Sequence, residues 1–334
     1  MSRMIRFGWL CLAAAMIGTL WLCCSPDRDL TIGPVDLDQF SPAPVTRSLL
    51  HVGAGTFEMG DGTGSSDERP VHLVTLGPFA IGGTEVTNAE YKAYIQYKAN
   101  IDSVILSVPT DPVLGYFNDY PDHPVVNVSW PDAVLYCNWL SQVTGLEPCY
   151  TLGRGYEADL TKVTLNLAKN GFHLPTEAQW ERAARGGLQG AQYPWGDDDP
   201  ETRGNSAEYA GPLAAERLPF SGSSGPLPVA SVESSFPDSL RPLSGFWVVD
   251  TAGNVWEWCD DFYGAEYYSV SPADNPPGPG RTEFSRDEWN AVPPKVIRGG
   301  GYNASASEMR CANRSKLSGL YKRPYVGFRV ARNL

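Results

Sequence analysis

The sequence has few of the residues that mark common catalytic and metal sites. It holds four histidines, and no two of them stand four positions apart, as the zinc ligands of a metalloprotease helix do. It also lacks a Cys-x-x-Cys pair, a Gly-x-Ser-x-Gly turn and a phosphate-binding glycine loop. These absences argue against a zinc site, a serine hydrolase of the α/β type and a P-loop nucleotide site.

Basic clusters are absent as well. The formal net charge is −12, and the lysines and arginines do not gather into the patch or stripe that is typical of nucleic-acid-binding domains. We therefore expect no nucleic-acid partner. Only 19% of the residues are charged and 42% are hydrophobic, which is typical of a folded globular chain. With 334 residues, the chain is long enough for one large domain or two small ones.

Aromatic residues and turn formers are plentiful. Ten Trp and sixteen Tyr accompany 34 Gly and 28 Pro, which indicates aromatic packing between many turns. Helix-start patterns stand at residues 87–90, 129–132 and 176–179. Alternating segments that predict short strands stand at residues 56–60, 71–75 and 326–330. Because helices and strands do not alternate regularly, we expect an α+β fold with little regular secondary structure.

The N-terminus has the features of an export segment. Arg3 and Arg6 precede an apolar run over residues 9–22, which has the length of a signal-peptide core and is short for a membrane span. The run ends at Cys23 and Cys24, and this ending resembles the lipobox of bacterial lipoproteins, in which a cysteine is lipidated. A cleaved signal peptide and an uncleaved anchor are the alternatives. In each case we expect the rest of the chain outside the cytoplasm.

The chain is accordingly divided into three parts. Residues 1–24 form the signal or lipoprotein segment, residues 25–46 form a proline-rich tether, and residues 47–334 form one domain. The stretches at 211–228 and 272–281 are rich in Pro, Gly and Ser and are interpreted as surface loops. We expect a lipoprotein in the periplasm or on the cell surface that contacts the membrane only through its N-terminal anchor.

Four cysteines follow the export segment: Cys137, Cys149, Cys259 and Cys311. Disulfides persist outside the cytoplasm, and four cysteines allow three connectivities, among which the sequence does not choose. Buried free thiols are the alternative. The helical spacing of the apolar residues around Cys137 predicts that this side chain is buried.

A short segment near residue 255 combines a turn with two acids. Asp250 and Glu257 flank Gly253, and carboxylates together with turn carbonyls are oxygen ligands that suit Ca²⁺. Acid pairs near a turn are more often solvated or capping groups, and neighbouring tryptophans are more often core residues than binding residues. By itself this segment is therefore weak evidence for a metal.

Nine short segments, read in order, resemble the formylglycine-generating enzyme (sulfatase-modifying factor) family. They are residues 55–60 (GTFEMG), 85–88 (EVTN), 124–130 (PVVNVSW), 174–181 (LPTEAQWE), 193–196 (YPWG), 253–258 (GNVWEW), 297–300 (IRGG), 310–314 (RCANR) and 327–329 (GFR). The resemblance spans roughly residues 48–332. It implies an elaborated C-type-lectin-like fold that is low in regular structure and often stabilised by calcium.

The family's enzymes oxidise a sulfatase cysteine to formylglycine with O₂, and two cysteines after the Arg-Gly-Gly strand bind Cu(I). Soft thiolates favour this metal. At the matching positions this sequence has Ala304 and a segment near Ser307 without cysteine, and Gly301 replaces the usual active-site serine. Cys311 matches a cysteine outside the copper pair. The resemblance therefore implies that Cu(I) binding is not expected here.

The resemblance also implies calcium ligands and a groove. Its stronger calcium site corresponds to Asp250, the backbone of Gly253 and Val255, and Glu257, and its weaker site corresponds to Asn205 and Ser206. We expect one calcium. Cys137–Cys149 and Cys259–Cys311 are candidate disulfides. A groove is expected at Trp256, Tyr302, Asn303 and Arg314.

Two functions follow as hypotheses. The missing cysteine pair favours a non-classical family member that acts as a binding or scaffold lipoprotein for a protein or peptide. The alternative is a formylglycine-generating oxidase acting on a sulfatase cysteine, or another O₂-dependent oxidation. No added helical domain or histidine triad supports the iron-dependent branch of the superfamily.

Overall fold

The computed structural model describes residues 49–100, 109–111, 115–153, 162–220, 223–232, 248–280 and 293–334. All of them belong to a compact unit that spans residues 37–334. The predicted export segment and tether, including Cys23 and Cys24, lie outside the described residues. Among the residues described, no helix combines the length and the apolar character that crossing a membrane requires.

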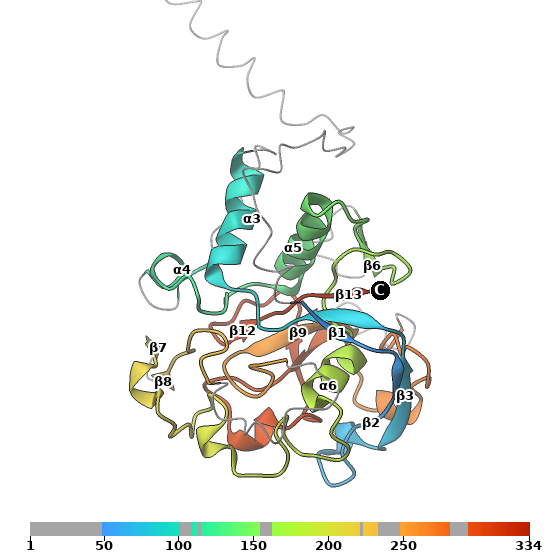
Figure 1. Cartoon of the computed structure of the whole chain (residues 1–334). Coiled ribbons are helices and arrows are strands. Elements are labelled where there is room, and N and C mark those ends of the chain that lie inside the picture. Colours follow the sequence, from blue (N-terminus) through green and yellow to red (C-terminus); the bar gives the residue numbers. More distant parts are fainter. Residues whose placement is uncertain are drawn as a thin grey trace, which may run out of the picture. The chain divides into compact units, whose positions relative to one another are not determined.

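Short strands form two small sheets and three hairpins (Figure 1). The four-stranded sheet has the order β11 (Ser315–Ser318), β10 (Pro294–Arg298), β9 (Trp256–Phe262), β12 (Val326–Gly327), and only the β12–β9 pair is parallel. The three-stranded sheet is antiparallel, with the order β1 (Leu49–Val52), β4 (Phe79–Gly82), β13 (Ala331–Asn333). The hairpins are β2 (Gly55–Met59) with β3 (His72–Leu76), β5 (Tyr150–Leu152) with β6 (Val163–Leu165), and β7 (Pro219–Phe220) with β8 (Ser223–Ser224).

The α-helices are α3 (Asn88–Asn100), α4 (Tyr116–Asp119), α5 (Trp130–Val143) and α6 (Glu177–Arg185). The 3₁₀ turns are η2 (Ser66–Glu68), η4 (Pro200–Thr202), η5 (Ala214–Glu216), η8 (Tyr267–Ser269) and η10 (Ala306–Met309). The three predicted helix starts are confirmed, since Thr87, Ser129 and Thr176 each cap a helix through the backbone N–H three residues later. Gly186 ends α6 at a φ of 55°, in the left-handed region that glycine favours.

One strand prediction was only partly right. Residues 326–330 alternate like a single strand, yet only Val326–Gly327 pair with β9, and the chain then crosses to the other sheet as β13. Arg329 lies at the crossing. Its guanidinium donates to the carbonyl oxygens of Gly82 and Val249, so the side chain fixes the passage between the two sheets.

Aromatic packing joins α3 to α5, which run side by side in Figure 1. Tyr94 of α3 meets Trp139 of α5 with ring centroids 5.2 Å apart, and Tyr136 meets Phe328 at 5.3 Å. Such pairs contribute about 0.5–1.5 kcal/mol each beyond their buried area. The α+β class with modest regular structure is confirmed, and aromatic side chains supply much of this part of the core.

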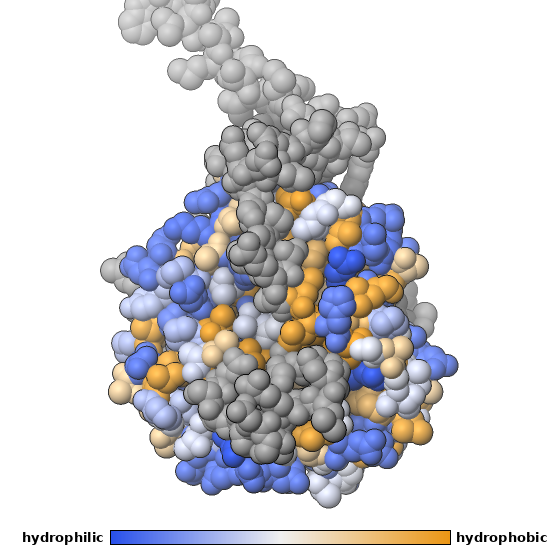
Figure 2. All heavy atoms as spheres, in the orientation of Figure 1, coloured by the Kyte–Doolittle hydropathy of each residue, from blue (hydrophilic) through white to orange (hydrophobic). Residues whose placement is uncertain are grey.

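Hydrophilic residues cover most of the rim of the face drawn in Figure 2, and hydrophobic residues gather toward its middle. In the described part of the chain, the exposed large apolar side chains are Val71, Leu73, Val270, Tyr321 and Leu334.

Candidate functional site

In the family that this sequence resembles, the copper-binding cysteines lie in the loop that corresponds to the loop after β10. Gly299 and Gly300 have φ values of 97° and 72°, and a side chain at either position would strain this turn. The Tyr302 N–H donates to the carbonyl of Asn254 at 2.8 Å, which holds the loop against the turn before β9. A Cβ on Gly301 would lie 3.1 Å from Cδ1 of Trp256, so this loop and Trp256 are in close contact.

Of the four predicted groove residues, only Asn303 is exposed. Trp256 and Tyr302 are 5% and 2% exposed. The Tyr302 ring packs edge to face on Phe220 at 5.4 Å, and its hydroxyl donates to the carbonyl of Pro324. Burial raises the pKa of Tyr302. Trp256 and Tyr302 therefore support the loop from beneath.

The placement of Arg314 in a groove was wrong. Its guanidinium is buried and makes two hydrogen bonds to the carboxylate of Glu177, at 2.7 and 2.9 Å. It also lies over the ring of Tyr268, 4.2 Å from the centroid. Arg314 therefore belongs to a buried ion network around α6. No local pattern indicates this pairing, because Glu177 is 137 positions away.

The loop offers no thiolate or imidazole ligand. Residues 299–310 contain neither cysteine nor histidine, and the soft thioether of Met309 is buried in an apolar cluster. Cys311 follows, but it packs in an apolar cluster with Trp180, Cys259 and Val296. Burial raises the pKa of Cys311 to about 12 and that of Cys259 well above its usual value, so both are protonated thiols at neutral pH. These residues do not fit a two-thiolate copper site.

All four described cysteines are free, so the two candidate disulfides are not formed. Cys149 instead donates its thiol to the carbonyl of Gly171 at 3.2 Å, and Cys137 lies fully buried in α5. Burial raises the pKa of Cys149 to about 11 and that of Cys137 well above its usual value. The alternative of buried thiols and the predicted burial of Cys137 are therefore confirmed.

The acid-rich turn before β9 has an unusual backbone. Asp250, Gly253 and Asn254 all have positive φ values, of 57°, 93° and 62°. Glu85, which was not among the predicted ligands, is 1% exposed and lies beside this turn. The Asn254 amide donates to Glu85 Oε1 at 3.1 Å, whereas Glu85 Oε2 is buried without a hydrogen-bond partner. The EVTN segment supplied the only sequence signal for this residue.

Glu257 is not available in the way that the resemblance implied. Both of its carboxylate oxygens accept from Arg329, at 2.5 and 2.6 Å, and Oε2 also accepts from the indole of Trp180 at 2.8 Å. These bonds use three of the roughly four acceptor positions of the carboxylate, and the charge of Arg329 opposes a cation beside it. Glu257 is therefore a weaker candidate ligand than the resemblance implied.

The charges around Asp250 nevertheless favour a bound cation. Glu85, Asp250 and Glu257 place three carboxylates around one guanidinium, that of Arg329. Burial and then the charges of Asp250 and Glu257 raise the pKa of Glu85, and burial raises the pKa of Asp250 to about 6. This buried excess of acid must be either protonated or compensated by a cation.

A cavity of about 20 Å³ adjoins Asp250, Asn205 and Thr251, which is room for one water or one ion. The side-chain oxygens of Asn205 and Thr251 are buried without a hydrogen-bond partner. No three His, Cys, Asp or Glu side chains of the described residues are grouped to hold a metal. The fit therefore rests on Asp250 together with amide and hydroxyl oxygens, a mixed set that suits Ca²⁺.

The weaker predicted calcium site does not fit. The carbonyl of Ser206 already accepts from Arg217 at 2.7 Å, and the amide of Asn205 donates to Asn254 and to the carbonyl of Gly225. A guanidinium at the Ser206 carbonyl excludes a second cation there by charge repulsion. Asn205 instead lines the same cavity as Asp250, although the two residues were predicted to belong to separate calcium sites.

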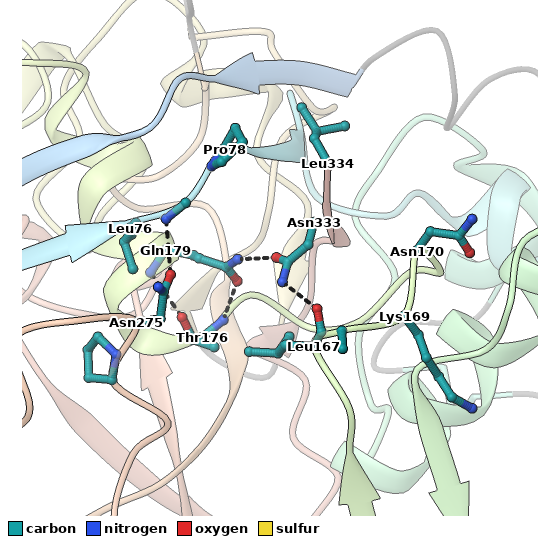
Figure 3. Close-up of a pocket in the computed structure, with 13 residues that line it drawn as sticks. Leu76, Pro78, Leu167, Lys169, Asn170, Thr176, Gln179, Asn275, Asn333 and Leu334 are labelled. Carbon is teal, nitrogen blue, oxygen red and sulfur yellow. Dashed lines mark hydrogen bonds between the residues drawn. The ribbon is translucent and has the colours of Figure 1, made fainter.

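A larger cavity of about 530 Å³ lies away from this loop (Figure 3). Carboxamides from separate elements line it. The Gln179 amide donates to Asn333 at 2.9 Å, the Asn333 amide donates to the carbonyl of Leu167 at 2.9 Å, and Asn275 accepts from Gly77 N–H at 3.0 Å. Sequence analysis noted residue 179 only as part of a helix start. The amides mainly satisfy one another and the backbone, so they stabilise the cavity wall.

The comparisons agree with the fold and the motif order. A family model described as "Sulfatase-modifying factor enzyme 1-like domain" matches residues 37–334. The chain belongs to this family. Its match starts within the predicted tether. The formylglycine-generating enzyme of Streptomyces coelicolor is 31% identical, over 86% of this chain and 89% of the relative.

Two further relatives bear on function. A Bos taurus protein named "Inactive C-alpha-formylglycine-generating enzyme 2" is 27% identical, over 66% of this chain and 72% of the relative. Among solved structures, Treponema denticola variable protein 1 superposes with a TM-score of 0.64 at 26% identity, covering 86% of this chain and 95% of that one. Active and inactive proteins are thus both named among the family members that resemble this chain.

Proposed function

We propose that this family member is an exported binding or scaffold domain for a protein or peptide, and not a copper-dependent oxidase. The observation that carries the proposal is the loop at residues 299–310, which has no thiol or imidazole. Cys311, the nearest thiol in sequence, is buried in an apolar cluster. Asn303 remains as an exposed side chain above Trp256 and Tyr302.

The relative named as inactive supports this proposal by showing that the domain also occurs under that description. The alternative, oxidation of a sulfatase cysteine or another O₂-dependent oxidation, is favoured by the identity to the Streptomyces coelicolor enzyme. The two proposals differ in a measurable way, because only the oxidase needs metal-bound thiolates.

The deciding experiment incubates the purified chain with Cu(I), O₂ and a peptide containing Cys-x-Pro-x-Arg. Mass spectrometry follows aldehyde formation, and the Streptomyces coelicolor enzyme serves as positive control. We expect no aldehyde and no stoichiometric Cu(I). Turnover that persists in a Cys259→Ser/Cys311→Ser double variant would defeat the binding proposal and show that other ligands carry the oxidation.

Calcium and export complete the proposal. We infer one Ca²⁺ at Asp250, with Asn205 and Thr251 as neutral ligands and Glu85 as the adjacent second acid. Calorimetric titration of the metal-free chain tests this, with Asp250→Ala as the variant expected to lose binding.

Lipidation is tested by labelling the expressing cells with a fatty acid, where Cys23→Ser and Cys24→Ser identify the modified residue. An unlabelled, released wild-type chain would refute the lipid anchor.

A further inference from the structure

Arg217 connects two loops that are far apart in sequence. Its Nη2 atom donates to the carbonyl of Ser206 at 2.7 Å and to the carbonyl of Tyr302 at 2.9 Å. The same loops also meet directly, because the Ala207 N–H donates to the carbonyl of Ala304 at 2.8 Å. One guanidinium therefore bridges the turn after residue 204 and the loop after β10.

The segment around Arg217 holds Tyr302 at two points. Arg217 binds its carbonyl, and Phe220, three residues later, packs edge to face on its ring. The guanidinium carbon in turn lies 5.9 Å from the ring centroid of Tyr209. Backbone and side chain of Tyr302 are thus fixed by the same short segment.

Carbonyl oxygens surround the charge of Arg217, as they often surround a bound metal ion. Its interactions among the described residues are with two carbonyl oxygens and one aromatic ring, without an ion pair to a carboxylate. Burial lowers its pKa, and the neighbouring Tyr209 opposes that effect. Its Nε atom is buried without a hydrogen-bond partner. Carbonyl oxygens converging on one positive charge are also the ligands that a hard cation receives.

We propose that Arg217 is a positioning residue that fixes the loop after Gly300 and takes the place of a second bound cation. A guanidinium differs from a metal ion in that chelators do not remove it. The loop that presents Asn303 is therefore held at any calcium concentration, while the site at Asp250 remains the one that responds to calcium.

The test compares Arg217→Met, which keeps the length without the charge, with Arg217→Lys, which keeps the charge but not the planar fork. Hydrogen exchange is followed at the amides of Tyr302, Ala304 and Ala207 in chelator. We expect exchange to rise by about tenfold or more in the Met variant and less in the Lys variant. Lys169→Met is the matched control, because Lys169 pairs with a Glu147 side chain that is 65% exposed and is far in sequence from both loops.

Two results would overturn the proposal. The first is equal protection of the loop amides in wild type and both Arg217 variants. The second is a second tightly bound Ca²⁺ per wild-type chain that disappears with Asn205→Ala, since a metal would then share the site with the arginine. If the Met variant does not fold, the Lys variant decides, because a role in packing alone predicts unchanged exchange at these three amides.

Discussion

Two groups of buried charges in this domain differ in their balance. Around α6, Glu177 and Glu181 face three guanidiniums, from Arg185, Arg298 and Arg314, and each carboxylate oxygen accepts at least one hydrogen bond. At the turn before β9, three carboxylates share the single guanidinium of Arg329, and Glu85 Oε2 has no partner. In the first group every carboxylate oxygen is paired within the chain, and only Nε of Arg298 is buried without a hydrogen-bond partner in the part of the network that the structure describes. The second group leaves room for a positive charge from outside.

This contrast separates structural charges from charges that can respond to a ligand. A buried pair whose groups satisfy each other adds specificity, and removing one partner is costly because the other stays buried and unpaired. A buried excess of one sign instead depends on pH and on cations.

Removing one partner from the paired group around α6 should have the largest effect. Arg298 bridges Glu177 and Glu181 at 2.8 and 2.6 Å and is fully buried. Arg298→Met should therefore lower the free energy of unfolding by about 3–5 kcal/mol, because both acids lose a buried partner. Urea denaturation monitored by tryptophan fluorescence measures this. A loss below about 1 kcal/mol would mean that the network contributes little to stability.

Removing an acid from the group at the turn before β9 should instead increase stability. Glu85→Gln takes away a buried acid whose raised pKa costs stability near neutral pH, and it keeps the shape of the side chain. In chelator it should raise the free energy of unfolding by about 1 kcal/mol or more. It should also weaken calcium binding in a calorimetric titration. Destabilisation in chelator would show that Glu85 is already compensated.

The pH dependence of stability should differ with and without calcium. The pKa of Asp250 is raised in the folded state from 3.8 to about 6, so the folded state binds the proton more tightly than the unfolded chain. In chelator, the contribution of Asp250 to stability is therefore full below about pH 4 and is lost as pH rises toward and through about 6. Saturating calcium should remove this loss. Thermal melts across this range check it. Asp250→Asn should show a smaller slope, because the raised pKa of Glu85 contributes a slope of the same sign.

An exposed pair should have the smallest effect. Lys169 and Glu147 pair at 3.1 Å, but the Glu147 side chain is 65% exposed. Lys169→Met should change stability by about 0.5 kcal/mol or less, since such pairs are screened by water and salt. Urea denaturation measures this change. A loss of stability comparable with that of Arg298→Met would show that burial does not determine how much an ion pair contributes.

Local features of the domain were predictable from sequence to a large extent. Thr87, Ser129 and Thr176 start helices as predicted, because a capping box is satisfied within three residues of the cap. The family and its α+β class followed from the order of short motifs, and the absence of cysteine from the loop after Gly300 is a property of the sequence itself.

The partners of the charged side chains were decided only by the tertiary structure. Glu257 was predicted to bind calcium, but Arg329, 72 positions later, donates hydrogen bonds to both of its carboxylate oxygens. Arg314 was placed in a groove but pairs with Glu177, while Glu85 and Arg217 gave no sequence sign of their contacts. A carboxylate or guanidinium accepts any partner of suitable charge and geometry. Which partner it meets depends on long-range packing, and a local pattern does not encode that.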